Sequence, residues 1–263
     1  MKVLSVNVNN FGGVSAKPLL SNYKLHNGKN DFSRWNSAVA TWRNENKICI
    51  AKNVASIVNL AYDFDVVFLH EVDTNCESWE LLQKMMGEKF ELKPANGVDV
   101  ELYKKGSKSI SCLFLKKEMV FEYEKSNVLG EGNQRNIEIK IADTYVIGLH
   151  MSYDISDWVK VIERFRYLKN KDERVILIGD LNVFDIGTDR RKKFDELINE
   201  GAIDIWLKQG ERNDVPTANT NKRIDYALTT QSVYEKGVVE IILSYVRREK
   251  ITDHSAIAVI YNE

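Results

Sequence analysis

Polar residues lie at the ends of apolar, strand-like runs at several widely separated points of this 263-residue chain. Rigid strands fix the positions of the residues at their ends, so side chains at such ends commonly assemble a site. Here these side chains are carboxylates, amides and imidazoles, which together indicate an oxygen-liganded metal ion and acid–base chemistry. The residues concerned are Asn7, Glu71, His150, Asp180, Asn182, Asp225, Asp253 and His254.

The composition is that of an ordinary globular protein, with 44% hydrophobic and 29% charged residues. The net charge is −1, so nucleic-acid binding needs a local basic patch or a bound cation. Three widely spaced cysteines predict neither a disulfide framework nor a zinc site, and Cys112 is expected to be a core thiol. The N-terminus is too polar for a signal peptide, and no transmembrane helix is expected, so a cytoplasmic location is the default.

The order of apolar runs predicts one domain over residues 1–263, with a polar insertion at about 13–47. We expect strands at 2–8, 65–70, 90–93, 98–104, 109–115, 118–124, 134–141, 144–149, 174–178, 224–229, 237–246 and 255–261. Helices are expected at 32–43, 52–64, 77–89, 156–169 and 189–200, with Gly201 at a C′ position, and residues 116–118 suggest a hairpin. Runs such as VILIG indicate strands buried on both faces, so two packed sheets with helices outside fit best.

Each motif also has a structural interpretation of its own. Asp180 and Asn182 in GDLN project to the same side of a strand end, but Gly-Asp and Asn are equally turn formers. Asp225 is also explained as a cap or an arginine partner, and Asp253 as an N-cap. A lone His254 is more often structural than catalytic.

Taken together, Asn7, Glu71, GDLN, RIDY and TDHS occur in an order and at intervals that resemble the endonuclease/exonuclease/phosphatase (deoxyribonuclease I-like) superfamily. The resemblance runs from Val3 to Ile260. It implies an α/β (α+β) fold, a four-layer αββα sandwich of two packed mixed β-sheets flanked by helices. It also implies hydrolysis of phosphoester bonds with Mg²⁺ or Mn²⁺.

The resemblance assigns roles motif by motif. It implies that Glu71, Asn7 and Asp253 hold or adjoin the metal, and that Asp180 and Asn182 orient the attacking water and the phosphate. His254 would face the phosphate with Asp225 as its carboxylate partner, which fixes the tautomer and raises the imidazole pKa. Whether Asp180 or His254 is the general base stays open, and Asp180 is favoured. His70 stands where most members have glutamine.

Three further positions carry alternatives. His150 matches a histidine of deoxyribonuclease-like members that contacts phosphate or protonates the leaving group; otherwise it is a buried histidine bonded to a carbonyl. Arg135 resembles the family arginine that reaches a substrate phosphate, and a surface salt bridge is equally expected. Trp35 and Trp42 suggest base stacking, although their seven-residue spacing favours one helix face packed on the core.

The function expected is that of a Mg²⁺/Mn²⁺-dependent DNA endonuclease or exonuclease of deoxyribonuclease-like type, a monomer with no membrane partner. The polar stretch before RIDY argues against an abasic-site enzyme, which carries aromatic residues there. The alternative is a phosphatase or phosphodiesterase for a small or lipid phosphoester. A third possibility is a decayed site used only for binding.

Overall fold

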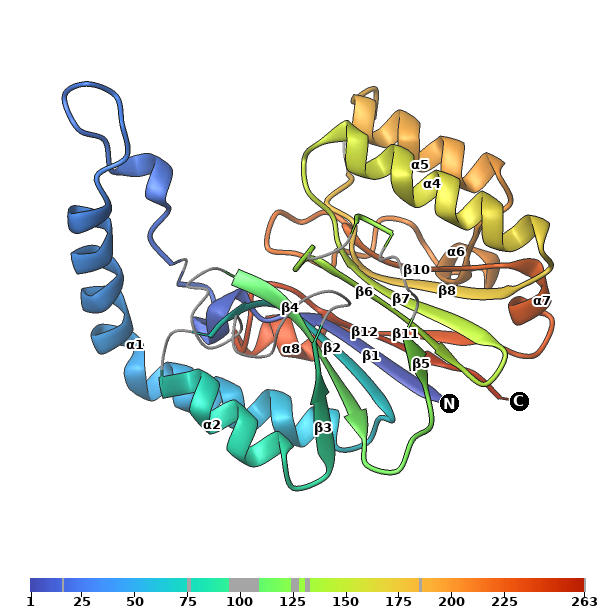
Figure 1. Cartoon of the computed structure of the whole chain (residues 1–263), viewed down its shortest axis with the longest axis horizontal. Coiled ribbons are helices and arrows are strands. Elements are labelled where there is room, and N and C mark those ends of the chain that lie inside the picture. The colour runs from blue at the N-terminus through green and yellow to red at the C-terminus, as the bar shows by residue number, and fades with distance from the viewer. Residues whose placement is uncertain are drawn as a thin grey trace.

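Two β-sheets pack face to face, and helices cover their outer faces (Figure 1). The structure is a computed structural model that describes residues 1–15, 17–74, 77–94, 109–123, 128–130, 133–184 and 186–262. The first sheet has the strand order β11-β12-β1-β2-β4-β3, and the second has the order β5-β6-β7-β8-β10-β9. This is the four-layer sandwich that the sequence predicts.

The strands of the first sheet are β1 (Lys2–Asn7), β2 (Val66–Asp73), β3 (Phe90–Lys93), β4 (Ser109–Lys116), β11 (Val239–Leu243) and β12 (Ala256–Ile260). Those of the second are β5 (Glu122–Tyr123), β6 (Asn136–Ile141), β7 (Thr144–His150), β8 (Arg174–Asp180), β9 (Ile203–Asp204) and β10 (Asp225–Thr229). Each sheet contains one parallel pair, β1 with β2 and β7 with β8, and the other pairings are antiparallel.

The helices are distributed between the two outer faces (Figure 1). On the side of the first sheet lie α1 (Phe32–Ala61) and α2 (Glu77–Met86), and on the side of the second lie α4 (Ile155–Asn170) and α5 (Asp189–Asn199). Short helices are α6 (Ile205–Lys208), α7 (Gln231–Tyr234) and α8 (Tyr245–Arg248), with 3-10 turns η1 (Asn9–Phe11) and η2 (Leu20–Asn22). None of the helices in the described part of the chain is both long and apolar enough to cross a membrane.

Strand β8 is apolar along its length because both of its faces are buried. Ile176 and Ile178 belong to the core cluster that includes the space between the sheets, whereas Val175 and Leu177 pack in the cluster under α4. A strand buried on both faces needs apolar residues at every position. At Gly148 of β7 a Cβ atom would lie 2.2 Å from the Phe68 ring of β2, so glycine lets the two sheets approach each other closely there.

The predicted elements need three corrections. The helices expected at 32–43 and 52–64 are one 30-residue helix, α1. Residues 44–51 contain no Gly or Pro, so nothing breaks the helix there. They are largely exposed and lack a clear apolar period, so the sequence pattern does not indicate a helix over them. The expected hairpin around 116–118 is wrong, since the chain turns at Glu118 and β5 pairs with β6 of the other sheet. The strand expected at 237–246 ends at Leu243, and α8 follows.

Other expectations hold. Gly201 follows the end of α5 with a φ of +99°, the left-handed conformation expected at C′. Cys112 is fully buried, and burial raises the pKa of its thiol. The strand expected at 98–104 lies outside the described residues.

Candidate active site

Strand ends from both sheets meet at one edge of the sandwich. The parallel pair β1 and β2 carries Asn7 and His70 in register, with Glu71 next along β2, and the parallel pair β7 and β8 ends on His150 and Asp180 in register. Strand β10 runs antiparallel and begins with Asp225, directly opposite Asp180. Strand direction alone therefore places residues that are up to 218 positions apart in the chain at one edge of the sandwich.

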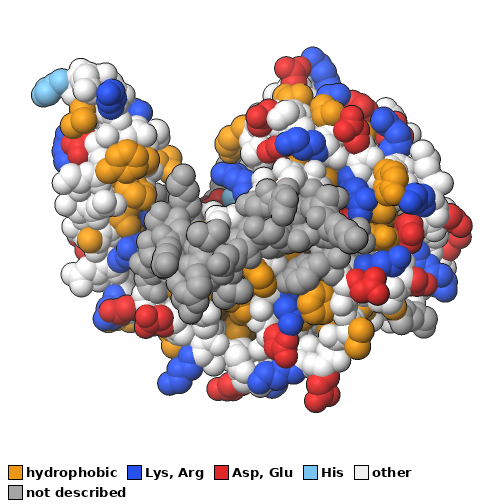
Figure 2. Space-filling model, in the orientation of Figure 1, with side chains coloured by type: hydrophobic (Ala, Val, Ile, Leu, Met, Phe, Trp, Pro, Cys, Tyr) orange, Lys and Arg blue, Asp and Glu red, His pale blue; other side chains and the backbone are white. Residues whose placement is uncertain are grey.

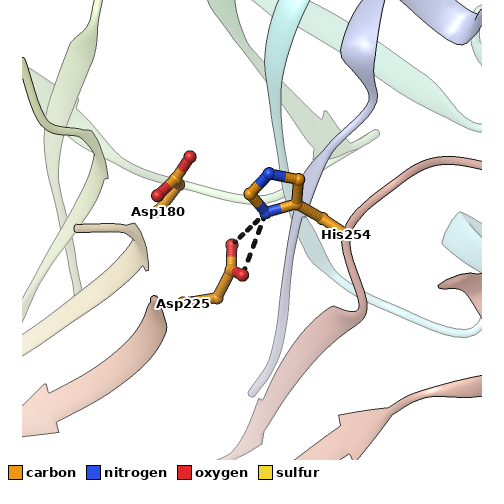
Figure 3. Close-up of side chains that lie close together, drawn as sticks. All are labelled: Asp180, Asp225 and His254. Atoms are coloured by element: carbon orange, nitrogen blue, oxygen red, sulfur yellow. Dashed lines mark hydrogen bonds and ion pairs between the residues drawn. The ribbon is translucent and has the colours of Figure 1, made fainter. Parts of the chain in front are cut away.

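His254 and Asp225 form the best-defined pair of the site. The Nδ1 atom of His254 lies 3.1 Å from Oδ1 and 3.0 Å from Oδ2 of Asp225 (Figure 3). Burial alone would lower the pKa of His254, but the carboxylates of Asp225, Asp180 and Asp253 raise it to about 10. The imidazole is therefore cationic at neutral pH, and its Nε2–H bonds to no described residue.

Asp180 lies beside this pair, held from both sheets. Its Oδ2 accepts a hydrogen bond of 3.0 Å from Nδ2 of Asn7, and its Oδ1 accepts one of 2.9 Å from the backbone N–H of Asn182. Burial raises the pKa of the Asp180 carboxyl to about 7, although the charge of His254 opposes the rise. At neutral pH this carboxylate is consequently a much stronger proton acceptor than a solvated aspartate.

Asn182 is held by its own side chain. The residue adopts a φ of +51°, a left-handed conformation that asparagine tolerates. Its Nδ2 donates to the carbonyl of Met151 at 3.0 Å, and Nη1 of Arg190 donates to its carbonyl at 2.5 Å. The residue thus reaches Asp180 through its backbone amide, while its side-chain oxygen remains available at the half-buried surface.

Glu71 sits at an irregularity of β2. Pairing with β4 shifts register between Leu69 and Val72, and Glu71 has a φ of +58°. A bulge of this kind re-aims a side chain. The Oε1 atom of Glu71 lies 3.4 Å from Nε2 of His150. Burial raises the pKa of the Glu71 carboxyl, while a hydrogen bond from Asn7 and the charges of His254 and Arg135 oppose the rise.

Two neutral histidines back this cluster. His150 lies with Nε2 3.9 Å from Oδ2 of Asp180, and burial lowers the pKa of its imidazole well below the ordinary value. His70, with its ring centroid 6.0 Å from that of His150, bonds to Ser5 Oγ at 3.1 Å and Ser111 Oγ at 2.8 Å. Burial lowers the pKa of His70 to about 3, so it acts as a neutral link between strands rather than as a charge.

The remaining expected residues lie at the rim or beside the carboxylates. Asn7 accepts at its Oδ1 a hydrogen bond of 3.0 Å from the backbone N–H of Asn9, and its Nδ2 donates to Asp180. Asp253 lies close enough to raise the pKa values of Glu71 and His254. Arg135 is exposed, and its charge lowers the pKa values of Glu71 and His150. It forms no ion pair with any described residue, so the surface salt bridge given as an alternative is not found among them.

A family model described as the Endonuclease/Exonuclease/phosphatase family matches residues 4–254. The chain belongs to this family. Its members are hydrolases that act on phosphoester bonds, so the chain is an enzyme of that class.

Solved structures with this family fold cover the whole chain. A 3′-5′ exonuclease from Neisseria meningitidis has a TM-score of 0.65 at 14% identity, with 100% of both chains covered. An AP endonuclease from Archaeoglobus fulgidus has a TM-score of 0.55 at 16% identity, again over 100% of both chains. The TDP2 protein of Caenorhabditis elegans has a TM-score of 0.56 at 15% identity over 99% of this chain and 97% of that one. No curated protein matches the chain.

The donor set of this family member fits a hard divalent cation. Glu71 and Asp253 are oxygen donors near each other, and the His150 ring, 3.4 Å from Glu71, is neutral. Half-buried carboxylates beside a neutral ring favour a cation in the site. Asp180, Asp225 and His254 also offer ligand atoms within 4.8 Å of one another, and the Nδ1 of His254 is already bonded to Asp225.

The sequence gives no hint of one residue that organises the site. The buried hydroxyl of Thr217 accepts hydrogen bonds of 3.0 Å from the backbone N–H groups of both Ile224 and Asp225. Its carbonyl accepts the N–H of Ser255 at 2.6 Å. Thr217 therefore ties the RIDY segment to the TDHS segment, and the polar run PTANT around it shows only a loop.

Proposed function

We propose that this family member is a Mg²⁺- or Mn²⁺-dependent phosphodiesterase that cleaves DNA as an endonuclease or exonuclease. The observation that carries the proposal is the pairing of a cationic His254, held by Asp225, with a basic Asp180 at the same strand ends. One group stabilises developing negative charge and the other accepts a proton, which are the two demands of phosphoester hydrolysis.

Each role follows from its protonation state. The imidazolium of His254 directs Nε2–H at a non-bridging phosphoryl oxygen, and its raised pKa makes it a poor base. Asp180 accepts the proton of the attacking water, and Asn7 and the backbone of Asn182 fix the direction of its oxygens. The side-chain oxygen of Asn182 is an acceptor, and it can take a hydrogen bond from the attacking water. The neutral ring of His150 and the guanidinium of Arg135 are the donors left to orient the substrate phosphate and the leaving oxygen.

Glu71 and Asp253 are the residues we assign to the metal ion. When bound, a divalent cation supplies Lewis-acid stabilisation of charge on the phosphoryl and leaving oxygens. Asn7 adjoins this position as a hydrogen-bond donor to Asp180 and Glu71.

Support for a DNA substrate comes from the proteins of similar fold. They include an exonuclease, an AP endonuclease and a Neisseria 3′ phosphatase solved with a product DNA hairpin, the last at 12% identity and a TM-score of 0.65. No apolar run near the site suggests a lipid substrate in the described chain, where the strand ends carry polar residues.

A substrate panel tests the proposal. With Mg²⁺, the protein should cleave supercoiled plasmid or end-labelled linear duplex, and also the p-nitrophenyl ester of thymidine monophosphate, and EDTA should abolish all three activities. Nicking of the closed circle identifies an endonuclease, and shortening of the linear duplex alone identifies an exonuclease. Turnover of small or lipid phosphoesters with no cleavage of any DNA would overturn the choice of substrate.

A further inference from the structure

Residues 17–47 form an arm that stands away from the layers. The arm contains η2, a loop and the first half of α1, and in Figure 1 it rises in blue at the left of the sheets. Within residues 17–47, all of which the structure describes, only Val39 and Trp42 are buried. Figure 2 shows an open hollow between this arm and the body of the molecule. The arm is therefore a wall of that hollow rather than a part of the core.

The arm is anchored next to the site. Asp73, at the end of β2 and two residues beyond Glu71, is contacted at its Oδ2 by Lys17 at 2.6 Å and Arg43 at 2.5 Å. The side chain of Asp73 is only 2% exposed, so this is a buried double ion pair. Strand β2 thus carries both a residue of the site and the attachment point of the arm.

The two tryptophans of the arm hold its own segments together. Trp35 donates from Nε1 to the carbonyl of Pro18 at 2.8 Å, and Trp42 donates to Oγ of Ser15 at 3.0 Å. Their shared helix face covers the segment that leads into the arm, which supports packing rather than base stacking. If the arm binds a ligand, the other side chains of the arm must make the contacts.

Positive charge is concentrated on the arm. Residues 17–47 contain six lysines and arginines and two acidic residues, a net charge of +4 in a chain whose total is −1. Lys17 and Arg43 are paired with Asp73, and Lys47 with Glu77. Lys24, Lys29 and Arg34 are exposed and form no ion pair with any described residue. Lys24 donates a hydrogen bond to the neutral side chain of Asn30, so the positive charges of all three residues remain uncompensated and can attract a polyanion.

We propose that the arm binds the phosphate backbone of the DNA that flanks the scissile phosphate, through Lys24, Lys29 and Arg34. The inference rests on the proposed function and adds a second contact region to it. From Arg43 to Phe32 the helix rises about 17 Å at 1.5 Å per residue. That length corresponds to about five base-pair steps of duplex at 3.4 Å per step. The arm therefore acts on nucleotides well away from the cut.

A membrane surface fits the arm less well. The exposed large apolar side chains of the arm are Leu19, Leu25 and Phe32, and mostly polar and charged residues separate them in the sequence. Insertion at a lipid interface needs a continuous apolar face. Charge complementarity with DNA phosphates is the stronger match.

The test neutralises the three cations together, as Lys24→Gln, Lys29→Gln and Arg34→Gln. The matched control is Lys171→Gln, Lys208→Gln and Lys236→Gln, three exposed lysines outside the arm. Affinity for a duplex of about 30 base pairs is measured against salt, in the His254→Ala background so that the DNA is not consumed. Hydrolysis of the p-nitrophenyl thymidine ester is measured in the otherwise unaltered enzyme.

The arm variant should bind DNA about tenfold or more weakly at low salt, with the slope of log affinity against log salt reduced by about 2 to 3. Its hydrolysis of the small ester should equal that of the unaltered protein. The defect should shrink for duplexes with fewer than about four nucleotides on either side of the cut, because these do not reach the tip. The control triple variant should match the unaltered protein in all three measurements.

The outcomes separate the two proposals. If the unaltered enzyme cleaves DNA and the arm variant binds and cleaves it equally well with the same salt slope, the arm proposal alone is overturned. If the unaltered enzyme hydrolyses the small ester but neither binds nor cleaves DNA, the proposed function fails and the arm proposal fails with it. Loss of binding to anionic phospholipid vesicles, with DNA binding unchanged, would assign the arm to a membrane and overturn the proposal.

Discussion

The Nε2 atom of His150 on β7 lies 3.4 Å from Oε1 of Glu71 on β2, so the two sheets touch through their polar ends. Burial keeps the pKa of His150 well below its ordinary value, and the ring is therefore neutral beside this carboxylate. Glu71 has no full countercharge from the ring, which is the electrostatic reason for assigning it to a cation.

Glu71→Gln should weaken metal binding, because an amide oxygen is a poorer ligand for Mg²⁺ than a carboxylate. The concentration of Mg²⁺ that gives half-maximal hydrolysis should rise by about tenfold or more, as for other losses of metal-site interactions. Titration of the rate with Mg²⁺ measures this, with Glu196→Gln on α5 as the control. An unaltered requirement would move the metal ligand elsewhere.

His150→Ala should lower kcat by less than the loss of His254, since a neutral ring adds hydrogen bonding without charge. The expected loss is about 10 to 100-fold in hydrolysis of the thymidine ester. A loss as large as that of His254→Ala would mean that the two histidines act as one unit.

Thr217→Val should remove the acceptor for two backbone N–H groups while keeping the shape of the side chain. We expect unfolding free energy to fall by about 1 to 3 kcal/mol, the cost of unpaired buried donors. The rate should fall as well, because Asp225 is no longer held in place. Thr217→Ser is the control, and it should restore both quantities. If Thr217→Val and Thr217→Ser lowered the unfolding free energy and the rate equally, the hydroxyl would not be the cause.

Stability should depend on pH through Glu240. Burial raises the pKa of this carboxyl to about 8, with the nearby Arg223 opposing the rise. The folded protein therefore keeps a proton that the unfolded chain releases near the ordinary pKa of about 4.3. This makes stability fall as pH rises from about 4 to about 8 and level off above that, by a total on the order of a few kcal/mol.

Glu240→Gln keeps the acceptor for the N–H of Trp206 and removes the ionisation. The loss of stability between pH 5 and pH 8 should therefore be smaller in this variant, by about 1 kcal/mol or more. Urea unfolding at the two pH values measures this difference, and Glu235→Gln, at an exposed residue directly after α7, is the control. The same pH dependence in the variant and the unaltered protein would remove Glu240 as its source.

The sequence predicts which site residues lie at strand ends. Asp180 and His150 end neighbouring parallel strands, and Asp225 begins the next, so their meeting follows once the apolar runs are identified as strands. The pairing of His254 with Asp225 follows from the family resemblance, and the geometry agrees with it.

Contacts that depend on tertiary structure were not accessible from the sequence. The bulge at Glu71, which lies beside His150, is a register shift between β2 and β4. Thr217 acts through loop amides that lie close only in the folded chain. The sequence does not indicate the continuity of α1, because residues 44–51 are largely exposed and lack a clear apolar period. Local pattern cannot distinguish such a stretch from a loop.

The central claim is that His254 and Asp225 act together on the phosphate. The most direct test compares Mg²⁺-dependent hydrolysis of the thymidine ester by His254→Ala, Asp225→Asn and the double variant. Each single change should lower kcat by about 100-fold or more, and the double variant should be no slower than the worse of the two, because the pair works as a unit. A rate for His254→Ala equal to that of the unaltered protein would contradict the account.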